Sequence, residues 1–256
     1  MFCGYAFTFV LILAIANYNA LGIDATSFFV IKNKKDIAES PTLEVTHKLK
    51  LIDMKLICIG RNYTDHIEEL ENERPTDPVV FLKPDTAILI KKQPFFIPDF
   101  SDDVHHEVEV LVKINRVGKH IDKKFAHKYY SEIGLGIDFT ARDLQSSLKA
   151  KGLPWEKAKA FDGSAVIGKW LPIKEVADVN NIEFSLKKNE NIVQKGITSH
   201  MLWKIDELIE YVSKYFTLKI GDIIFTGTPA GVGKVYANDK LKGYIEKTEM
   251  FSITVK

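Results

Sequence analysis

Cysteine is scarce in this chain of 256 residues, which contains only Cys3 and Cys58. Two cysteines exclude a disulfide framework and a cysteine-rich zinc site. Excess charge is also lacking, because 35 lysines and arginines face 34 aspartates and glutamates, a formal net charge of +1. Without a basic field to recruit polyanions, we expect no nucleic-acid partner. The length suits one domain, or one domain with an appendage.

Long apolar runs are lacking too. The run from Phe7 to Ala16 is shorter than a membrane span requires, so we expect no stable membrane insertion. Its end resembles a signal-peptidase site, yet no lysine or arginine precedes Lys32, and secretory signals begin with positive charge. We therefore interpret residues 1–53 as a poorly ordered or non-native extension, with a signal peptide as the alternative. The folded domain is expected over 54–256, in the cytoplasm, or exported if the signal is real.

Nucleotide-binding and serine-nucleophile motifs are absent. The segment Thr226–Lys234 resembles a phosphate-binding loop, but Thr228 replaces the required glycine and Val235 follows the lysine. A dinucleotide fingerprint fails at Gly134–Gly136, because Phe139 occupies its third glycine position. No Gly-x-Ser-x-Gly elbow is present. The amides and the hydroxyl of the 226–234 loop suit a small carboxylate or oxyanion instead.

Two glutamates lie within an apolar stretch. His105–Val112 predicts a strand whose alternation places Glu107 and Glu109 on one face and three valines on the other. Carboxylates this close repel, and a hard divalent cation removes that conflict. A half-buried strand with an acidic wet face is the alternative. Asp138, after a strand predicted over 133–137, is either a third carboxylate of such a site or a strand-end cap.

Two further patterns have both a structural and a chemical interpretation. His66 and Glu69 lie three residues apart on a helix predicted from about 64 to 73. They form either a solvated surface pair or a base oriented by a carboxylate. Lys83 follows a buried strand predicted over 79–82, and its ammonium group either reaches solvent or lies in a pocket.

Hydrophobic period and turn residues predict the remaining elements. Strands are expected at 55–59, 222–226 and 250–255, a hairpin over 182–195, helices over 122–130 and 140–150, a core-facing helical stripe over 205–216, and a loop over 151–168.

Six sequence blocks follow one another from about Lys55 to the C-terminus. They are Ile59–Tyr63 with His66 and Glu69, Phe81–Pro84, His106–Glu109, Gly136–Asp138 with Thr140–Asp143, Lys159 with Phe161–Ser164, and Thr226–Gly233. In this combination the chain resembles the fumarylacetoacetate hydrolase family, and within it the short acylpyruvase and oxaloacetate decarboxylase branch. Ala165-Val166 and Asn191 depart from the usual family pattern, which leaves substrate choice open.

The resemblance implies an α+β, mostly β fold, a mixed β-sheet roll with short flanking helices, and a homodimer. It also implies residue roles. Glu107, Glu109 and Asp138 match metal ligands for Mg²⁺ or Mn²⁺, with Ca²⁺ also compatible; His66 and Glu69 match a catalytic dyad on a lid helix; Lys159 matches a lysine near the substrate carbonyl oxygens; and Arg61, Lys83, Gln145 and Thr228 match pocket positions.

The activity that the resemblance implies is metal-dependent cleavage of a C–C bond in a small 2-oxo acid. The reaction is acylpyruvate hydrolysis to pyruvate and a carboxylate, oxaloacetate decarboxylation, or both. An isomerase or decarboxylase of 2-hydroxyhepta-2,4-diene-1,7-dioate-type substrates is the nearest alternative. A non-catalytic metal-binding or ligand-binding module is the competing class, and it would have no need for His66, Glu69 and Lys159 together.

Overall fold

The computed structural model describes residues 54–69 and 73–256, and for residues 66–68 it describes the backbone alone. These residues fall within a single contact unit, Ile52–Lys256. The extension and the signal peptide predicted within residues 1–53 lie outside the described part of the chain. Within that part, no helix combines the length and the apolar character needed to cross a membrane.

A six-stranded sheet forms the centre of the fold. Its spatial order is β2-β1-β10-β4-β5-β7. The bounds are β1 Leu56–Gly60, β2 Val79–Lys83, β4 Val108–Ile114, β5 Tyr130–Asp138, β7 Ala165–Pro172 and β10 Ile223–Phe225. Neighbouring strands are antiparallel, except that β1 and β10 are parallel. The central strands are apolar along most of their length because both faces of the sheet are covered.

Two smaller sheets have the orders β13-β12-β8-β9 and β11-β3-β6. Their bounds are β3 Val104–His106, β6 Thr140–Ala141, β8 Glu183–Lys188, β9 Asn191–Ile197, β11 Gly233–Lys234, β12 Lys240–Ile245 and β13 Thr248–Thr254. The predicted hairpin is confirmed as β8 and β9. Its turn residues Asn189 and Glu190 both have positive φ, 52° and 69°. Two such residues match the twist of the flanking strands in a two-residue hairpin loop.

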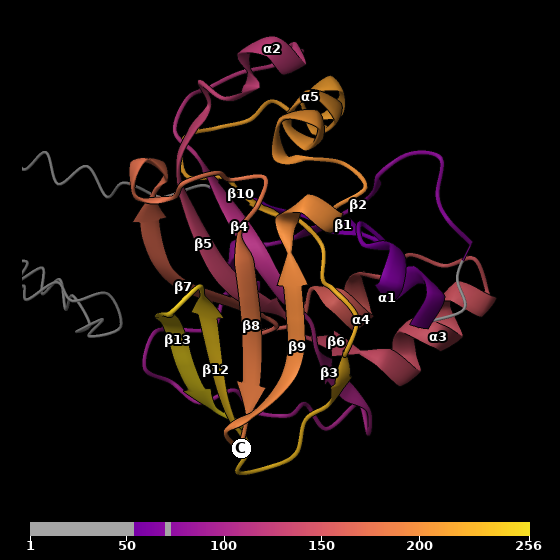
Figure 1. Cartoon of the computed structure of the whole chain (residues 1–256). Coiled ribbons are helices and arrows are strands. Elements are labelled where there is room, and N and C mark those ends of the chain that lie inside the picture. Colours follow the sequence, from indigo (N-terminus) through magenta and orange to yellow (C-terminus); the bar gives the residue numbers. More distant parts are fainter. Residues whose placement is uncertain (1–53, 70–72) are drawn as a thin grey trace, which may run out of the picture. The chain divides into compact units, whose positions relative to one another are not determined.

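Short helices flank the sheets, as expected for a mostly β member of the α+β class. The bounds are α1 Thr64–Glu69, α2 Lys123–Ala126, α3 Arg142–Ala150, α4 Glu156–Lys159 and α5 Ile205–Tyr215, with 3₁₀ turns η3 Asp85–Ala87, η4 Ile173–Glu175 and η5 Thr198–His200. Figure 1 shows α2 beside α5 at one end of the molecule, and α3 and α4 together at the side near β6. The apolar stripe of α5 is buried, as predicted.

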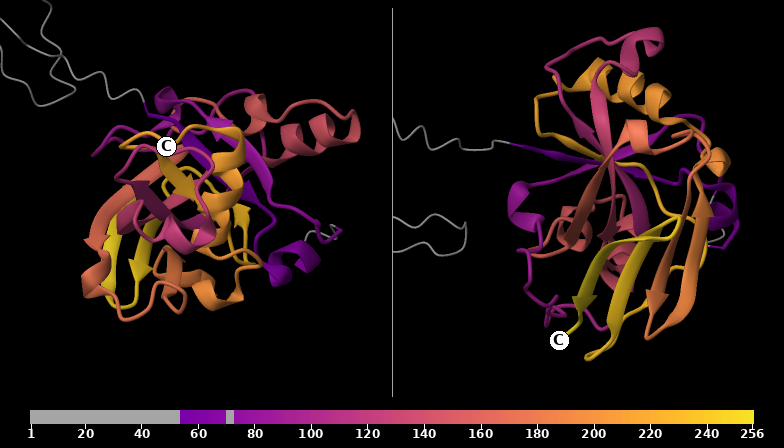
Figure 2. Two further views of the ribbon diagram at one scale, coloured as in Figure 1. Left: turned by 90° about the horizontal axis from the view of Figure 1, so that it is seen from above. Right: turned by 60° about the vertical axis from the view of Figure 1, so that its left-hand side comes forward.

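Alternation along β4 assigns its side chains to two sides of the sheet. Val108 and Val110 pack in one core cluster with residues of the four-stranded sheet. Val112 packs with buried residues of α5. Leu111 belongs to a third cluster. Figure 2 shows the four-stranded sheet, in orange and yellow, along one side of the six-stranded sheet. Glu109 has the same parity as Leu111, so its side chain points away from the four-stranded sheet and α5.

The strand predicted over 105–112 is present but broken. β3 ends at His106 and β4 begins at Val108, so Glu107 stands between two strands that belong to different sheets. The expectation of one continuous strand was therefore wrong. The reason is tertiary: β3 pairs with β6 and β11, whereas β4 pairs with β5 and β10.

Other predicted bounds were wrong where pairing with distant segments overrides local propensity. The helix expected over 122–130 ends at Ala126, because Tyr130 pairs with Ile114 and begins β5. The helix expected over 140–150 begins at Arg142, because the two preceding residues form β6. The segment predicted as a loop over 151–168 contains α4 and the start of β7.

Candidate active site

The break before β4 and the end of β5 bring three carboxylates together. Glu109 pairs with Gly136, and the amide of Asp138 donates to the carbonyl of Glu107 at 2.8 Å. One carboxylate oxygen from each of Glu107, Glu109 and Asp138 lies within 4.8 Å of the other two. All three side chains are buried, with at most 4% of any residue exposed. The acidic wet face is therefore excluded, and Asp138 joins the glutamates at the strand end.

Two cationic side chains contact this cluster from α4 and α3. The ammonium group of Lys159, the last residue of α4, donates to Glu107 Oε2 at 2.8 Å, to Asp138 Oδ2 at 2.7 Å and to Thr140 Oγ1 at 2.6 Å. Arg142, the first residue of α3, donates from its guanidinium to Glu107 Oε1. Both helices thus supply counter-charge to the carboxylates.

Lys83 supplies a third cation from the end of β2. Its residue is 1% exposed, so the ammonium group lies in the interior and the solvent interpretation is wrong. The ammonium nitrogen lies 2.7 Å from Asp138 Oδ1. It also donates to Ser164 Oγ at 2.9 Å and to Ser164 O at 3.1 Å. Lys83 therefore forms a buried ion pair with Asp138, and its own charge is enclosed by protein.

Burial and mutual repulsion control protonation in the cluster. Burial raises the pKa of Glu109 well above its usual range, the charges of Asp138 and Glu107 raise it further, and Lys159 and the Gly227 amide oppose them. Burial alone would lower the pKa of Lys159, but Asp138 and Glu107 outweigh it, so that pKa is raised. Lys159 is therefore an ammonium ion at neutral pH.

The glycine-rich loop of residues 226–233, hereafter the TGTP loop, lies against the cluster. The amide of Gly227 donates to Glu109 Oε2 at 2.7 Å, and the amide of Gly231 donates to Glu69 Oε1 at 2.9 Å. Gly227 has a φ of 100°, and a Cβ there would lie 2.7 Å from Asn62 Cβ. Only glycine fits that position. Through its two amide bonds the loop connects the end of α1 with β4, hereafter called the ligand strand.

A cavity of about 50 Å³ adjoins the carboxylates. Its lining includes seven of the ten predicted site residues: Arg61, Glu107, Glu109, Asp138, Gln145, Lys159 and Thr228. Lys83 lies behind Asp138 outside that lining, and Glu69 contacts the TGTP loop at Gly231. The backbone of His66 lies in α1, while its side chain is outside the described set.

Sequence reasoning gave no role to several residues at this site. Arg142 lay within a block that carried the family resemblance. It is a basic residue near the start of the helix that follows the strand ending at Asp138, and this position was a usable signal. Phe81, Lys149 and Trp155 also line the cavity. Gln194 of β9 is 1% exposed and contacts both the ligand strand and the TGTP loop. A glutamine in an alternating hairpin strand carries no sequence signal for such contacts.

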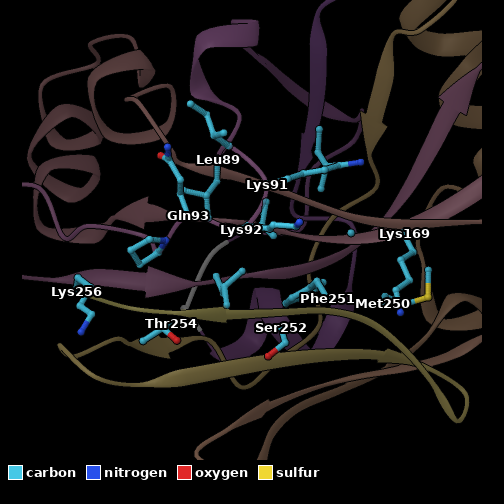
Figure 3. A pocket seen from close by; sticks show the side chains of 16 residues that line it. Leu89, Lys91, Lys92, Gln93, Lys169, Met250, Phe251, Ser252, Thr254 and Lys256 are labelled. Carbon is cyan, nitrogen blue, oxygen red and sulfur yellow. The ribbon is translucent and has the colours of Figure 1, made fainter. Parts of the chain in front are cut away.

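A larger cavity, of about 580 Å³, lies elsewhere and shares no lining residue with the first. It is a groove between the segment around Leu89–Pro94, β7 and β13. Figure 3 shows Lys91, Lys92 and Gln93 on one side of this groove and Ser252 and Thr254 on the other. No residue of the carboxylate cluster faces it, so cavity size alone would misplace the site.

The family profile described as "Fumarylacetoacetate (FAA) hydrolase C-terminal" matches residues 55–256. The chain belongs to the fumarylacetoacetate hydrolase family. This match confirms the resemblance inferred from the six sequence blocks.

Individual relatives agree with the family assignment. The chain is 43% identical over 188 residues to the oxaloacetate tautomerase YcgM of Escherichia coli K12, covering 73% of this chain and 86% of that protein. It is 42% identical over 189 residues to a mitochondrial oxaloacetate decarboxylase of Dictyostelium discoideum, covering 73% and 87%. The crystal structure of fumarylpyruvate hydrolase from Pseudomonas aeruginosa, in complex with Mn²⁺ and pyruvate, superposes with a TM-score of 0.74 at 32% identity, covering 78% and 88%. The chain is thus an enzyme of this family, with the family's strand-rich α+β fold.

The donor set fits a hard divalent cation. Three buried carboxylate oxygens within 4.8 Å of one another suit Mg²⁺ or Mn²⁺, which prefer oxygen ligands. Octahedral coordination needs six ligands, so three carboxylates leave room for substrate oxygens and water. Burial, followed by repulsion from Asp138 and Glu107, raises the pKa of Glu109, and a bound cation would favour the ionised form of this carboxyl.

Proposed function

We propose that this chain is a divalent-metal-dependent enzyme that cleaves a C–C bond in a small 2-oxo acid, through oxaloacetate decarboxylation, hydrolysis of a short acylpyruvate to pyruvate and a carboxylate, or both. One observation carries the proposal: Lys159 contacts two of three clustered carboxylates inside a cavity of about 50 Å³. A non-catalytic binding module has no need for a buried lysine there.

The charges around the cavity support an anionic substrate. Three carboxylates, Glu107, Glu109 and Asp138, face the three enclosed cations of Lys83, Lys159 and Arg142. A divalent cation added to this balanced set leaves two positive charges in excess. A dianionic 2-oxo acid neutralises them, and burial makes that neutralisation strong.

Two further basic side chains line the cavity. Arg61 and Lys149 also line the cavity, and burial together with the charges of Arg61 and Arg142 lowers the pKa of Lys149. These groups raise the local concentration of an anionic substrate. Their planar or flexible cationic ends suit the second carboxylate of a short dicarboxylic acid.

The bound cation, Mg²⁺ or Mn²⁺, would be held by Glu107, Glu109 and Asp138, and it would supply Lewis-acid stabilisation of the negative charge that develops beside the ketone. Lys159 donates hydrogen bonds toward the same region as a protonated amine. Gln145 and the TGTP loop around Thr228 close the cavity wall and hold the substrate in register. Lys83 holds the Asp138 carboxylate in place through its 2.7 Å contact with Oδ1.

For hydrolysis, His66 and Glu69 act on water. His66 serves as the base that deprotonates the attacking water, and Glu69 orients its ring. Glu69 already contacts the TGTP loop through the amide of Gly231, which supports a lid position for α1 over the cavity. Decarboxylation needs no attacking water, so the same site can run it without this dyad.

Keto–enol tautomerisation of oxaloacetate is the second candidate. The observation in its favour is the 43% identity to the oxaloacetate tautomerase of Escherichia coli. Tautomerisation passes through the same carbanionic centre as decarboxylation and needs the same charge stabilisation. The two candidates differ in whether the bond to the departing carboxylate breaks.

The test is a substrate panel with purified protein: oxaloacetate, acetylpyruvate and a heptadiene dioate, each with Mn²⁺, with Mg²⁺ and with a chelator. Pyruvate release reports cleavage, and loss of enol absorbance without pyruvate reports tautomerisation. Asp138→Asn should abolish metal-dependent turnover. Glu132→Gln is the matched control, because Glu132 lies on the same strand but pairs with Lys113 at the surface.

Each outcome of the panel has a defined meaning. Metal-dependent pyruvate release that Asp138→Asn removes and Glu132→Gln keeps supports the proposal. Enol–keto conversion without pyruvate favours the tautomerase. Turnover of the dioate alone favours the isomerase alternative, and no turnover of any substrate contradicts all three.

A further inference from the structure

The side chain of Gln194 reaches from β9 to four polar groups at the edge of the site. Its amide oxygen lies 3.0 Å from the backbone nitrogen of Val108 and 3.0 Å from His106 Nδ1. Its amide nitrogen lies 2.9 Å from Thr228 Oγ1 and 3.0 Å from the carbonyl oxygen of Pro229. The residue is 1% exposed, so these four contacts satisfy a fully buried amide.

Two backbone groups fix the direction of every bond in this network. The amide of Val108 can only donate, so it must face Gln194 Oε1. The carbonyl of Pro229 can only accept, so it must face Gln194 Nε2. His106 then carries its proton on Nδ1, because Oε1 can only accept. Burial, which lowers the pKa of His106 to about 4, agrees with this neutral ring.

The same logic fixes the hydroxyl of Thr228. Its oxygen accepts from Gln194 Nε2, and it donates its single proton to the carbonyl of Val108 at 2.9 Å. Thr228 also lines the cavity, and its single hydroxyl proton is used by the carbonyl of Val108. While this bond is kept, the hydroxyl has no proton to donate to a carboxylate or an oxyanion. An acceptor at this position suits a donor group, such as an enol hydroxyl or an ordered water.

The network also holds the backbone of the TGTP loop. A Cβ at Gly231 would lie 2.3 Å from Val193 O and 3.3 Å from Gln194 Cγ, so the loop lies directly on β9. The loop amides of Gly227 and Gly231 donate to Glu109 and Glu69. Any shift of the loop on β9 therefore moves the hydrogen bonds to a ligand carboxylate and to the end of α1.

We propose that Gln194 is a positioning residue, which fixes the TGTP loop on the ligand strand and turns the Thr228 hydroxyl so that it accepts a hydrogen bond from an enol hydroxyl or from an ordered water. The proposal rests on the proposed function for its kinetic consequences. Gln194 touches no reacting atom, and it acts through Thr228. Its loss should weaken catalysis more than metal binding, because Glu107 and Asp138 keep their contacts with Lys159 and only Glu109 depends on the loop.

The test compares Gln194→Met, Thr228→Val and the double variant. Methionine keeps the volume of glutamine and removes all four hydrogen bonds. We expect Gln194→Met to lower kcat on oxaloacetate about 10- to 100-fold, the range that a misplaced group produces, with a smaller change in KM and a metal Kd within about threefold of wild type. If Gln194 acts through Thr228, Thr228→Val should reduce kcat little further in the Gln194→Met background.

Thr198→Val is the matched control. Thr198 lies just after β9, is 1% exposed, accepts from the amide of Ile182 at 2.9 Å and donates to Val179 O at 2.9 Å. It does not contact the TGTP loop through these bonds, so its loss should lower stability and leave kcat unchanged. Hydrogen exchange of residues 226–233 gives a readout without activity. It should accelerate about tenfold or more in Gln194→Met and stay unchanged in Thr198→Val.

Three results would overturn the inference: kcat of Gln194→Met within twofold of wild type, multiplying effects of the two substitutions, or an equal loss of kcat in Thr198→Val. Unchanged exchange of the TGTP loop in Gln194→Met would also overturn it. A wild-type protein that turns over no substrate contradicts the proposed function instead. The exchange experiment then decides by itself whether Gln194 holds the loop.

Discussion

Replacing Lys159 by methionine would leave three buried carboxylates without the ammonium group that bridges two of them. Methionine has nearly the same length, so the change removes charge and creates little cavity. Removing one partner of a buried ion pair typically costs about 3–5 kcal/mol, because the other charge stays buried. We expect a loss of this size in the free energy of unfolding at pH 7 without metal. Against a usual total of about 5–15 kcal/mol, the variant should still fold.

The raised pKa of Glu109 determines how the stability loss in Lys159→Met changes with pH. Its pKa in the folded protein is raised above its usual range, first by burial and then by Asp138 and Glu107. A carboxyl of this kind stabilises the fold below its unfolded pKa, and that contribution is lost as pH rises through the folded pKa. Lys159→Met removes a cation that opposes this shift. The stability gap between the variant and wild type should therefore narrow as pH falls from 7 toward 5.

Urea unfolding with a chelator, from pH 5 to 8, measures both effects. Lys113→Met is the control, because Lys113 pairs with Glu132 at 2.8 Å where both side chains are more than a third exposed. A surface pair contributes about 0–1 kcal/mol. Added Mn²⁺ should recover more stability in Lys159→Met than in wild type, because it replaces the missing positive charge. Equal losses for the two lysine variants at pH 7 would refute the counter-charge role of Lys159.

Three further predictions concern the dyad, the TGTP loop and the assembly. His66→Ala should slow acetylpyruvate hydrolysis about 10²- to 10⁴-fold, the contribution of a general base, and spare oxaloacetate decarboxylation; equal loss in both assays would contradict the division of labour. Gly227→Ala should cost more stability than Gly152→Ala in thermal unfolding, because Gly227 has a φ of 100° and an added Cβ there would lie 2.7 Å from Asn62 Cβ, whereas Gly152 (φ 63°) has nothing within 4 Å of an added Cβ. Light scattering during gel filtration should give the mass of a homodimer, and a monomer at micromolar concentration would contradict that expectation.

Local sequence pattern predicted the ligand strand well and its interruption badly. Alternation placed Val108 and Val110 in the core, and both are fully buried. The break at Glu107 arises because the residues before it pair with β6 and β11, both far along the chain. Such pairing costs loop-closure entropy and leaves no trace in local propensity. The same limitation explains why the start of β7 was expected to lie in a loop.

The candidate site likewise combines features that the local sequence predicts with features that only the packing of distant segments determines. Residues with a chemical signature, such as the three carboxylates and Lys159, were found from ordered motifs, and they lie together. The direction of a hydrogen bond has no such signature. Thr228 was correctly predicted to line the pocket, but the fate of its proton depends on Gln194 and on the carbonyl of Val108. The direction of this bond is set only when three segments far apart in the sequence pack together.

Charge balance leads to a last prediction, on the order of binding. Lys83, Lys159 and Arg142 balance the three carboxylates, so a divalent cation adds two unbalanced positive charges to those of Arg61 and Lys149 in the cavity wall. A dianion removes this cost, and linkage requires each ligand to tighten the other by the same factor. Calorimetric titration should therefore give a lower Kd for Mg²⁺ with a dianionic 2-oxo acid present than without it. A monoanion such as pyruvate should tighten Mg²⁺ less, which would favour product release after decarboxylation. Equal Mg²⁺ affinity with and without the dianion would show that the three cations do not balance the carboxylates as their distances imply.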